Sequence, residues 1–229
     1  FLLNYGNEFG DTITLGHELG HGFHGECLNT QTALNADYPM PIAETASTFC
    51  ETIIKKAALK SADAKDKLFI LENELCDCAQ VIVDIYSRYL FESRLIEKRQ
   101  EGPLSVEEIK ALMLEAQKEA YGHGLDHRYL HPYMWTWKPH YYEADYAFYN
   151  FPYAFGLLLA KGLYGLYQKQ GATFADTYEH FLSLTGKMSL EDVGKSVGID
   201  LQDPAFWQNS IDMIKDDIDL FEKLLKQLV

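Results

Sequence analysis

The chain has 229 residues, of which 47% are hydrophobic and 24% are charged, a balance typical of a soluble globular protein with a sizeable core. Its 34 acidic and 20 basic residues give a net charge of −14, which excludes a nucleic-acid backbone as a favourable partner. No apolar stretch is long enough to cross a membrane, so we do not expect a membrane partner either.

The chain begins with Phe1, Leu2 and Leu3, which we interpret as the end of a strand that leads into Gly6 and a following helix. This apolar start is too short for the hydrophobic region of a signal peptide and has no basic flank. Because the chain starts without Met shortly before the motif described next, we expect a C-terminal portion of a longer protein, without its N-terminal half.

The most informative segment runs from Thr14 to His21 and contains the pattern His-Glu-x-x-His within a helical pattern. Four residues make slightly more than one helical turn, so the imidazoles of His17 and His21 lie on one face and can reach one metal ion. Glu18 lies one position further, where it can contact a metal-bound water without binding the metal. The pattern therefore predicts a Zn²⁺ site.

The alternative is a surface helix that happens to carry His and Glu residues. Gly16, Gly20 and Gly22 weigh against it, because each glycine costs about 1 kcal/mol inside a helix. We expect these glycines to allow the close approach of a second helix or of a substrate backbone. His24 is rotated away from the metal and is expected to be packed or to face the substrate.

A catalytic zinc site of this kind needs a third protein ligand. The extended metzincin pattern is absent, because His24 and Cys27 occupy the positions of its glycine and its third histidine. Glu26 is expected at or beyond the end of the helix, and Asp37 lies in a turn-like stretch, so both are poorly placed. Glu44 is the preferred candidate.

Glu44 lies in a stretch that resembles a helix start, with Pro41 in its first turn, and the helix is predicted over 42–61. Small neighbours of Glu44 would let this helix pack closely on the helix that carries His17. Glu51 follows two turns later on the same face and could accept the other ring N–H of a zinc-bound histidine. The alternative for Glu51 is a solvated helix charge.

The remaining pattern is helical. Residues 65–99 are apolar on nearly all sides over their first two-thirds, which predicts a buried central helix. Further helices are expected from a capping box at Ser105 to Tyr121, over 154–168 and 173–184, after Ser189, and from Pro204 onward. No strand set, repeat or linker is evident after the first residues, so we predict one all-α domain over 1–229.

Three further histidines, His123, His127 and His131, recur at four-residue spacing and could suggest a second metal site. Gly122, Gly124 and Pro132 interrupt this stretch, so a glycine-rich loop near a cleft is the preferred interpretation, with His127 as a candidate substrate contact. The cysteines have no zinc-knuckle or Cys-x-x-Cys spacing, which favours reduced thiols in a cytoplasmic protein.

Two blocks of the sequence resemble one known family. The run HELGHGFH, followed after a short loop by PIAETASTFCE, is similar to the catalytic core of the thimet oligopeptidase and oligoendopeptidase F family of zinc metallopeptidases. Downstream, KPHYY and FYNFPYAFG resemble the His- and Tyr-rich segment with which that family stabilises its tetrahedral intermediate, in the form common among bacterial oligoendopeptidase F proteins.

The resemblance implies a zincin-like catalytic domain with Zn²⁺ ligands at His17, His21 and Glu44, and with Glu18 as the general base. It also implies short peptides as substrates, cleaved in a deep channel of which this chain supplies one wall. A catalytically silent peptide-binding or scaffold module is the alternative, but a binding module has no need for the Glu18 base. No pattern indicates the oligomeric state or the cleavage preference.

The developing negative charge on a peptide carbonyl oxygen needs hydrogen-bond donors besides the metal. His140 with Tyr149 or Tyr153 is the expected pair, and Tyr146 is a third tyrosine that could take this role or bind the substrate. Aromatic runs are more often core than catalytic, so packing is the alternative for each tyrosine. A surface on which bases or sugars stack is a third interpretation, and the acidic charge balance disfavours a nucleic-acid backbone as the partner.

Overall fold

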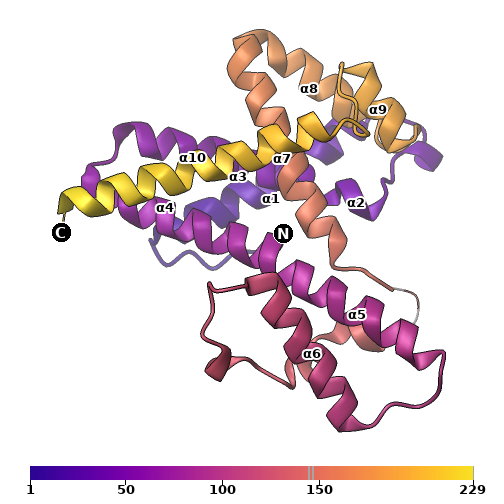
Figure 1. The fold of residues 1–229 in the computed structure, drawn as a ribbon. Coiled ribbons are helices and arrows are strands. Elements are labelled where there is room, and N and C mark those ends of the chain that lie inside the picture. Colours follow the sequence, from indigo (N-terminus) through magenta and orange to yellow (C-terminus); the bar gives the residue numbers. More distant parts are fainter. Residues whose placement is uncertain (144, 146, 229) are drawn as a thin grey trace. The chain divides into compact units, whose positions relative to one another are not determined.

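Figure 1 shows the computed structural model of the chain, which describes residues 1–143, 145 and 147–228. These residues form helices and no strand, so the all-α prediction is confirmed. The α-helices are α1 (Phe9–Leu28), α2 (Met40–Ala43), α3 (Thr45–Ser61), α4 (Ala64–Ala79), α5 (Ile85–Arg99), α6 (Val106–Tyr121), α7 (Phe151–Gln170), α8 (Phe174–Ser183), α9 (Leu190–Ser196) and α10 (Pro204–Leu228). Short 3₁₀ helices occur at Ala33–Asn35, His127–Tyr129, Met134–Trp137, Pro139–Tyr142 and Gly171–Thr173.

The prediction of a strand at Phe1–Leu3 is wrong. Within the described part of the chain these residues have no regular structure, and no other extended segment is present to pair with their backbone groups. An apolar start alone therefore did not indicate a strand.

The chain divides into two compact units, the first formed by residues 1–76 and 155–229 and the second by residues 77–154. That the whole chain forms one domain stays a prediction. The first unit has a hydrophobic core built from α1, α3, α7, α8 and α9, against which Phe206, Trp207 and Met213 of α10 pack. The second unit has a smaller cluster in which Phe91 of α5 meets Leu112, Met113 and Ala116 of α6.

In the first unit α1 and α3 lie side by side, and glycines set their separation (Figure 1). A Cβ added at Gly20 would lie 2.5 Å from the carbonyl oxygen of Ala46 and 2.6 Å from the Cα of Ser47. A Cβ at Gly16 would clash with the flexible Ile54 side chain. The prediction that these glycines allow a second helix to approach is therefore confirmed at Gly20, where the α3 backbone itself lies in contact. Gly22, in contrast, has nothing within 4 Å of such a Cβ.

The segment predicted as one helix over 42–61 is two helices. α2 ends at Ala43, α3 begins at Thr45, and Glu44 lies between them with φ −89° and ψ 1°. Helical hydrogen bonding resumes at once, because the Thr48 N–H donates to the Glu44 carbonyl over 3.1 Å. Glu44 therefore occupies a junction rather than the interior of a helix.

The stretch predicted as one buried helix over 65–99 also differs. A π-helical turn at Gln80–Asp84 separates α4 from α5. The stretch is not buried on all sides, since Phe69, Tyr86 and Tyr89 are exposed. Hydrophobic composition indicated helix correctly, but it could not show the shift in hydrogen bonding within a continuous helical run.

The later elements follow their sequence signals. Ser105 accepts from the Glu108 N–H over 3.3 Å and the Glu108 carboxylate accepts from the Ser105 N–H over 2.8 Å, so the capping box is confirmed. α7, α8, α9 and α10 start and end within a few residues of the predicted positions. Residues 122–126 contain no helix, as the glycine pattern predicted.

The four cysteines are free, with Cys27 and Cys78 buried, Cys50 half-buried and Cys76 exposed. Among the described residues, no helix combines the length and the apolar character needed to cross a membrane.

The glycine contacts predict opposite effects for two neighbouring substitutions. Gly20→Ala should lower the free energy of unfolding by about 2 kcal/mol or more, because the new methyl group overlaps the α3 backbone. Gly22→Ala, in open space on the same helix, should raise it by about 0.5–1 kcal/mol through helix propensity. Urea unfolding of both variants measures the difference, and equal effects would contradict the proposed helix contact.

Candidate functional site

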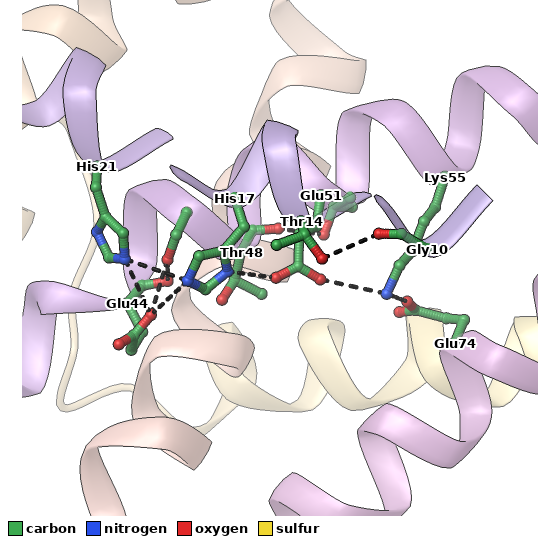
Figure 2. A network of polar contacts seen from close by, with 11 residues as sticks. Gly10, Thr14, His17, His21, Glu44, Thr48, Glu51, Lys55 and Glu74 are labelled. Atoms are coloured by element: carbon green, nitrogen blue, oxygen red, sulfur yellow. Dashed lines mark hydrogen bonds and ion pairs between the residues drawn. The ribbon is translucent and has the colours of Figure 1, made fainter. Parts of the chain in front are cut away.

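Side chains from α1 and from the α2–α3 junction converge on one point in the first unit (Figure 2). The Nε2 atoms of His17 and His21 lie 3.2 Å apart. Oε2 of Glu44 lies 3.4 Å from Nε2 of His17 and 3.5 Å from Nε2 of His21. Among the described residues, these three side chains form the group of His, Cys, Asp or Glu that could hold a metal ion.

The backbone explains how Glu44 reaches the two histidines. The close contact at Gly20 brings the start of α3 against α1, and the junction directs the Glu44 side chain toward the imidazoles. Ser47 then fixes the carboxylate, because its Oγ donates to Oε2 of Glu44 over 2.9 Å. Gly156 of α7 leaves the necessary space, since a Cβ there would lie 3.0 Å from the Cβ of Glu44.

Glu51 contacts the opposite edge of the His17 ring. The Nδ1 and Oε1 atoms lie 2.7 Å apart, so the Nδ1–H donates to the carboxylate and the Nε2 lone pair points toward the three-residue group. This hydrogen bond raises the pKa of His17, against the opposing effect of burial, and the negative charges of Glu51, Glu44 and Glu18 add to the increase. The contact of Glu51 with His17 agrees with the position predicted for it.

Glu18 follows His17 on α1 and is half-buried. The two alternative acidic candidates lie outside the three-residue group. Asp37 is exposed and accepts from the Tyr38 N–H over 2.9 Å. Glu26 is exposed in the last turn of α1, not beyond the helix, and pairs with Asn29.

Of the two alternatives predicted for His24, packed in the core or facing the substrate, the structure shows the first. Its side chain is fully buried, its Nε2 lies 2.8 Å from Oγ1 of Thr185, and its ring stacks on Tyr38 with centroids 3.9 Å apart. Burial, with a smaller contribution from the charge of His21, lowers the pKa of His24 to about 4. It is therefore a neutral core residue near neutral pH.

The expected oxyanion donors belong to the second unit. There the His140 ring stacks on Tyr149 with centroids 5.1 Å apart, and Tyr149 meets Tyr153 edge to face at 6.3 Å. Burial, followed by the charges of Arg88 and Lys138, lowers the pKa of His140. Tyr146 lies outside the described residues. The action of these side chains on a substrate stays a prediction.

The contacts that hold the segment around Tyr149 were not predicted from the sequence. The Phe148 N–H donates to Glu92 over 2.8 Å, and Arg88 donates to the Asn150 side chain over 2.9 Å. Phe148 has a φ of 58°, an unusual conformation for a bulky residue, so these two contacts stabilise a strained turn. The four-residue spacing of Arg88 and Glu92 on α5 was the available signal.

His127, the candidate substrate contact, is exposed, and its Nε2 lies 3.1 Å from the Gly122 carbonyl oxygen.

Comparison with known proteins identifies the family. The profile of peptidase family M3 matches residues 1–213, so the chain belongs to that family. The chain is 28% identical to oligopeptidase PepF of Bacillus subtilis over 230 residues, which cover 99% of the chain and 34% of PepF. It is 29% identical to the chromosomal oligoendopeptidase F of Lactococcus lactis subsp. cremoris over 230 residues, 99% of the chain and 36% of that protein.

Solved structures agree on the fold. The crystal structure of oligoendopeptidase-F from Enterococcus faecium matches with a TM-score of 0.79 at 22% identity, over 95% of this chain and 40% of that one. The chain thus spans about a third of the length of the curated relatives it matches.

The buried His24 predicts a specific pH dependence. A histidine with a lowered pKa in the folded state stabilises the fold fully above its unfolded pKa of about 6.5, and this stabilisation is lost as the pH falls toward about 4. Over that window the unfolding free energy of the wild type should fall relative to His24→Leu by up to about 3 kcal/mol. Denaturant unfolding of metal-free protein at several pH values measures this, and a constant difference would contradict it.

Proposed function

We propose that this chain carries the catalytic centre of a zinc-dependent endopeptidase that hydrolyses short peptides. The observation that carries the proposal is the convergence of His17, His21 and Glu44 on one point, with Glu18 beside them on α1. Membership of peptidase family M3 and the oligopeptidase names of the relatives support the reaction and the class of substrate.

The spacing of the three side chains fits a Zn²⁺ ion. Two nitrogens and one oxygen bound at about 2.1 Å with tetrahedral angles are separated by about 3.4 Å from one another. The observed separations are 3.2, 3.4 and 3.5 Å. Two imidazoles and one carboxylate form a common ligand set of catalytic zinc sites, which leave a fourth position for water. The donor atoms therefore have both the chemistry and the spacing that this ion needs.

Bound zinc would lower the pKa of the attacking water toward 7 and polarise the substrate carbonyl. Glu18 would accept the proton from that water as it adds to the carbonyl carbon. When the C–N bond breaks, Glu18 would pass this proton to the nitrogen of the leaving amine. Glu51 would hold the His17 ring in place through Nδ1, as it does in the structure.

The developing negative charge on the substrate carbonyl oxygen would need hydrogen-bond donors besides the metal. His140 with Tyr149 or Tyr153 would donate hydrogen bonds to the oxygen that gains negative charge. Within the second unit, the stacking of His140 on Tyr149 and the hydrogen bond from Phe148 to Glu92 support a fixed arrangement of these two rings relative to each other. The cytoplasmic location inferred from the cysteines stays a prediction.

A catalytically silent peptide-binding module is the alternative, and Glu18 distinguishes the two. In the full-length protein, Glu18→Gln should retain zinc and fold but lose peptide hydrolysis by several orders of magnitude, because the base is removed while the ligands remain. Turnover of a fluorogenic peptide library and zinc content measure the two properties. Glu26→Gln, an exposed change on the same helix, is the matched control and should keep both.

Two results would contradict the proposal. Substantial residual turnover in Glu18→Gln would show that this carboxylate is not the general base. A full-length wild-type protein that binds zinc and peptides without cleaving any would favour the binding module.

A further inference from the structure

We propose that Lys55 is a positioning residue for the candidate metal centre. It holds the Glu51 carboxylate in the orientation in which Glu51 accepts the Nδ1–H of His17, and so acts on the centre through Glu51. The inference rests on the proposed function, because it concerns the same centre.

The geometry is a chain of alternating charges that ends at His17 (Figure 2). Oε1 of Glu51 lies 2.7 Å from His17, and its other oxygen, Oε2, lies 3.3 Å from Nζ of Lys55. The same Nζ lies 2.9 Å from Oε2 of Glu74 on α4. Oε1 of Glu74 in turn lies 2.5 Å from Nζ of Lys161 on α7. Each oxygen of Glu51 therefore has a different partner, so both ends of the carboxylate are held.

These charges are buried. Lys55 is 5% exposed, Glu74 8% and Lys161 0%. Burial would raise the pKa of Glu74, but the charges of Lys161 and Lys55 outweigh it and lower that pKa to about 2. Glu74 is therefore an anion at all ordinary pH values and provides a fixed anchor for the Lys55 ammonium group.

Stability alone does not account for this arrangement. Replacing buried ion pairs with well-packed apolar side chains is often neutral or stabilising, so an apolar residue could fill this position without the desolvation cost of a buried lysine. Lys55 has one effect that an apolar residue could not reproduce, since only a donor can hold Oε2 of Glu51. A carboxylate that supports a metal-binding histidine affects metal affinity by about 10- to 100-fold. Loosening that carboxylate should therefore weaken metal binding in a folded protein.

The test is the dissociation constant of Zn²⁺, measured by competition with a chromophoric chelator. Lys55→Met should weaken zinc binding by about 3- to 10-fold, because the Glu51 carboxylate loses one of its two partners. The matched control is Lys56→Met, the next residue on α3, whose Nζ pairs with Asp217 at 2.5 Å. It also removes an ion-paired lysine and should leave zinc affinity nearly unchanged.

A double-mutant cycle separates positioning from a general loss of structure. Glu51→Gln should weaken zinc binding by itself, and Lys55→Met should have little further effect in that background. If Lys55→Met does not fold, Glu74→Gln serves as the second variant, because it keeps Lys55 but weakens its anchor. It should also weaken zinc binding, and an unchanged affinity would overturn the inference.

The inference is also overturned if folded Lys55→Met binds zinc as the wild type does, or if its effect is equally large in the Glu51→Gln background. In both cases the proposed function survives, provided that the wild type binds zinc. A wild type that binds no zinc contradicts the proposed function and the inference together.

Discussion

The backbone of α3 lies directly against Gly20 of α1, and the geometry of the candidate metal centre depends on that contact. α1 supplies both imidazoles, but it has no carboxylate in position to join them. The third donor, Glu44, comes from the junction just before α3, so its distance from the histidines is set by how closely the two helices approach. A side chain at position 20 would push the junction away. Gly20, which lies within the His-Glu-x-x-His pattern, is therefore part of the candidate site.

Electrostatics adds a second constraint. Glu44, Glu51 and Glu18 surround His17 and raise its pKa, so the centre attracts positive charge. Two buried lysines, Lys55 and Lys161, lie further out and neutralise Glu74, and Lys55 also contacts the far oxygen of Glu51. Glu44 thus lies beside both imidazoles and Glu51 contacts His17, while Lys55 holds the far oxygen of Glu51. This arrangement suits a divalent cation at the three donor atoms.

Helical periodicity was sufficient to place His17 and His21 together, and the proline-led helix start pointed to Glu44, which lies beside them in the structure. Both inferences depend on local spacing, which the sequence displays directly. The break at Glu44 was not visible in the local spacing, and neither were the contacts that hold its side chain, with Ser47 and with Gly156 far along the chain. Lys55 was missed for a similar reason. Its four-residue spacing from Glu51 is common on helix surfaces, and its role depends on Glu74 of another helix.

The most direct test of the account is the zinc content of the purified chain and of two variants by elemental analysis. The account predicts one zinc ion per wild-type chain and a much lower affinity in Glu44→Ala, because one of three ligands is lost. Asp37→Ala, which removes an exposed carboxylate outside the centre, should keep the zinc. Full zinc in Glu44→Ala together with its loss in Asp37→Ala would contradict the assignment of the third ligand.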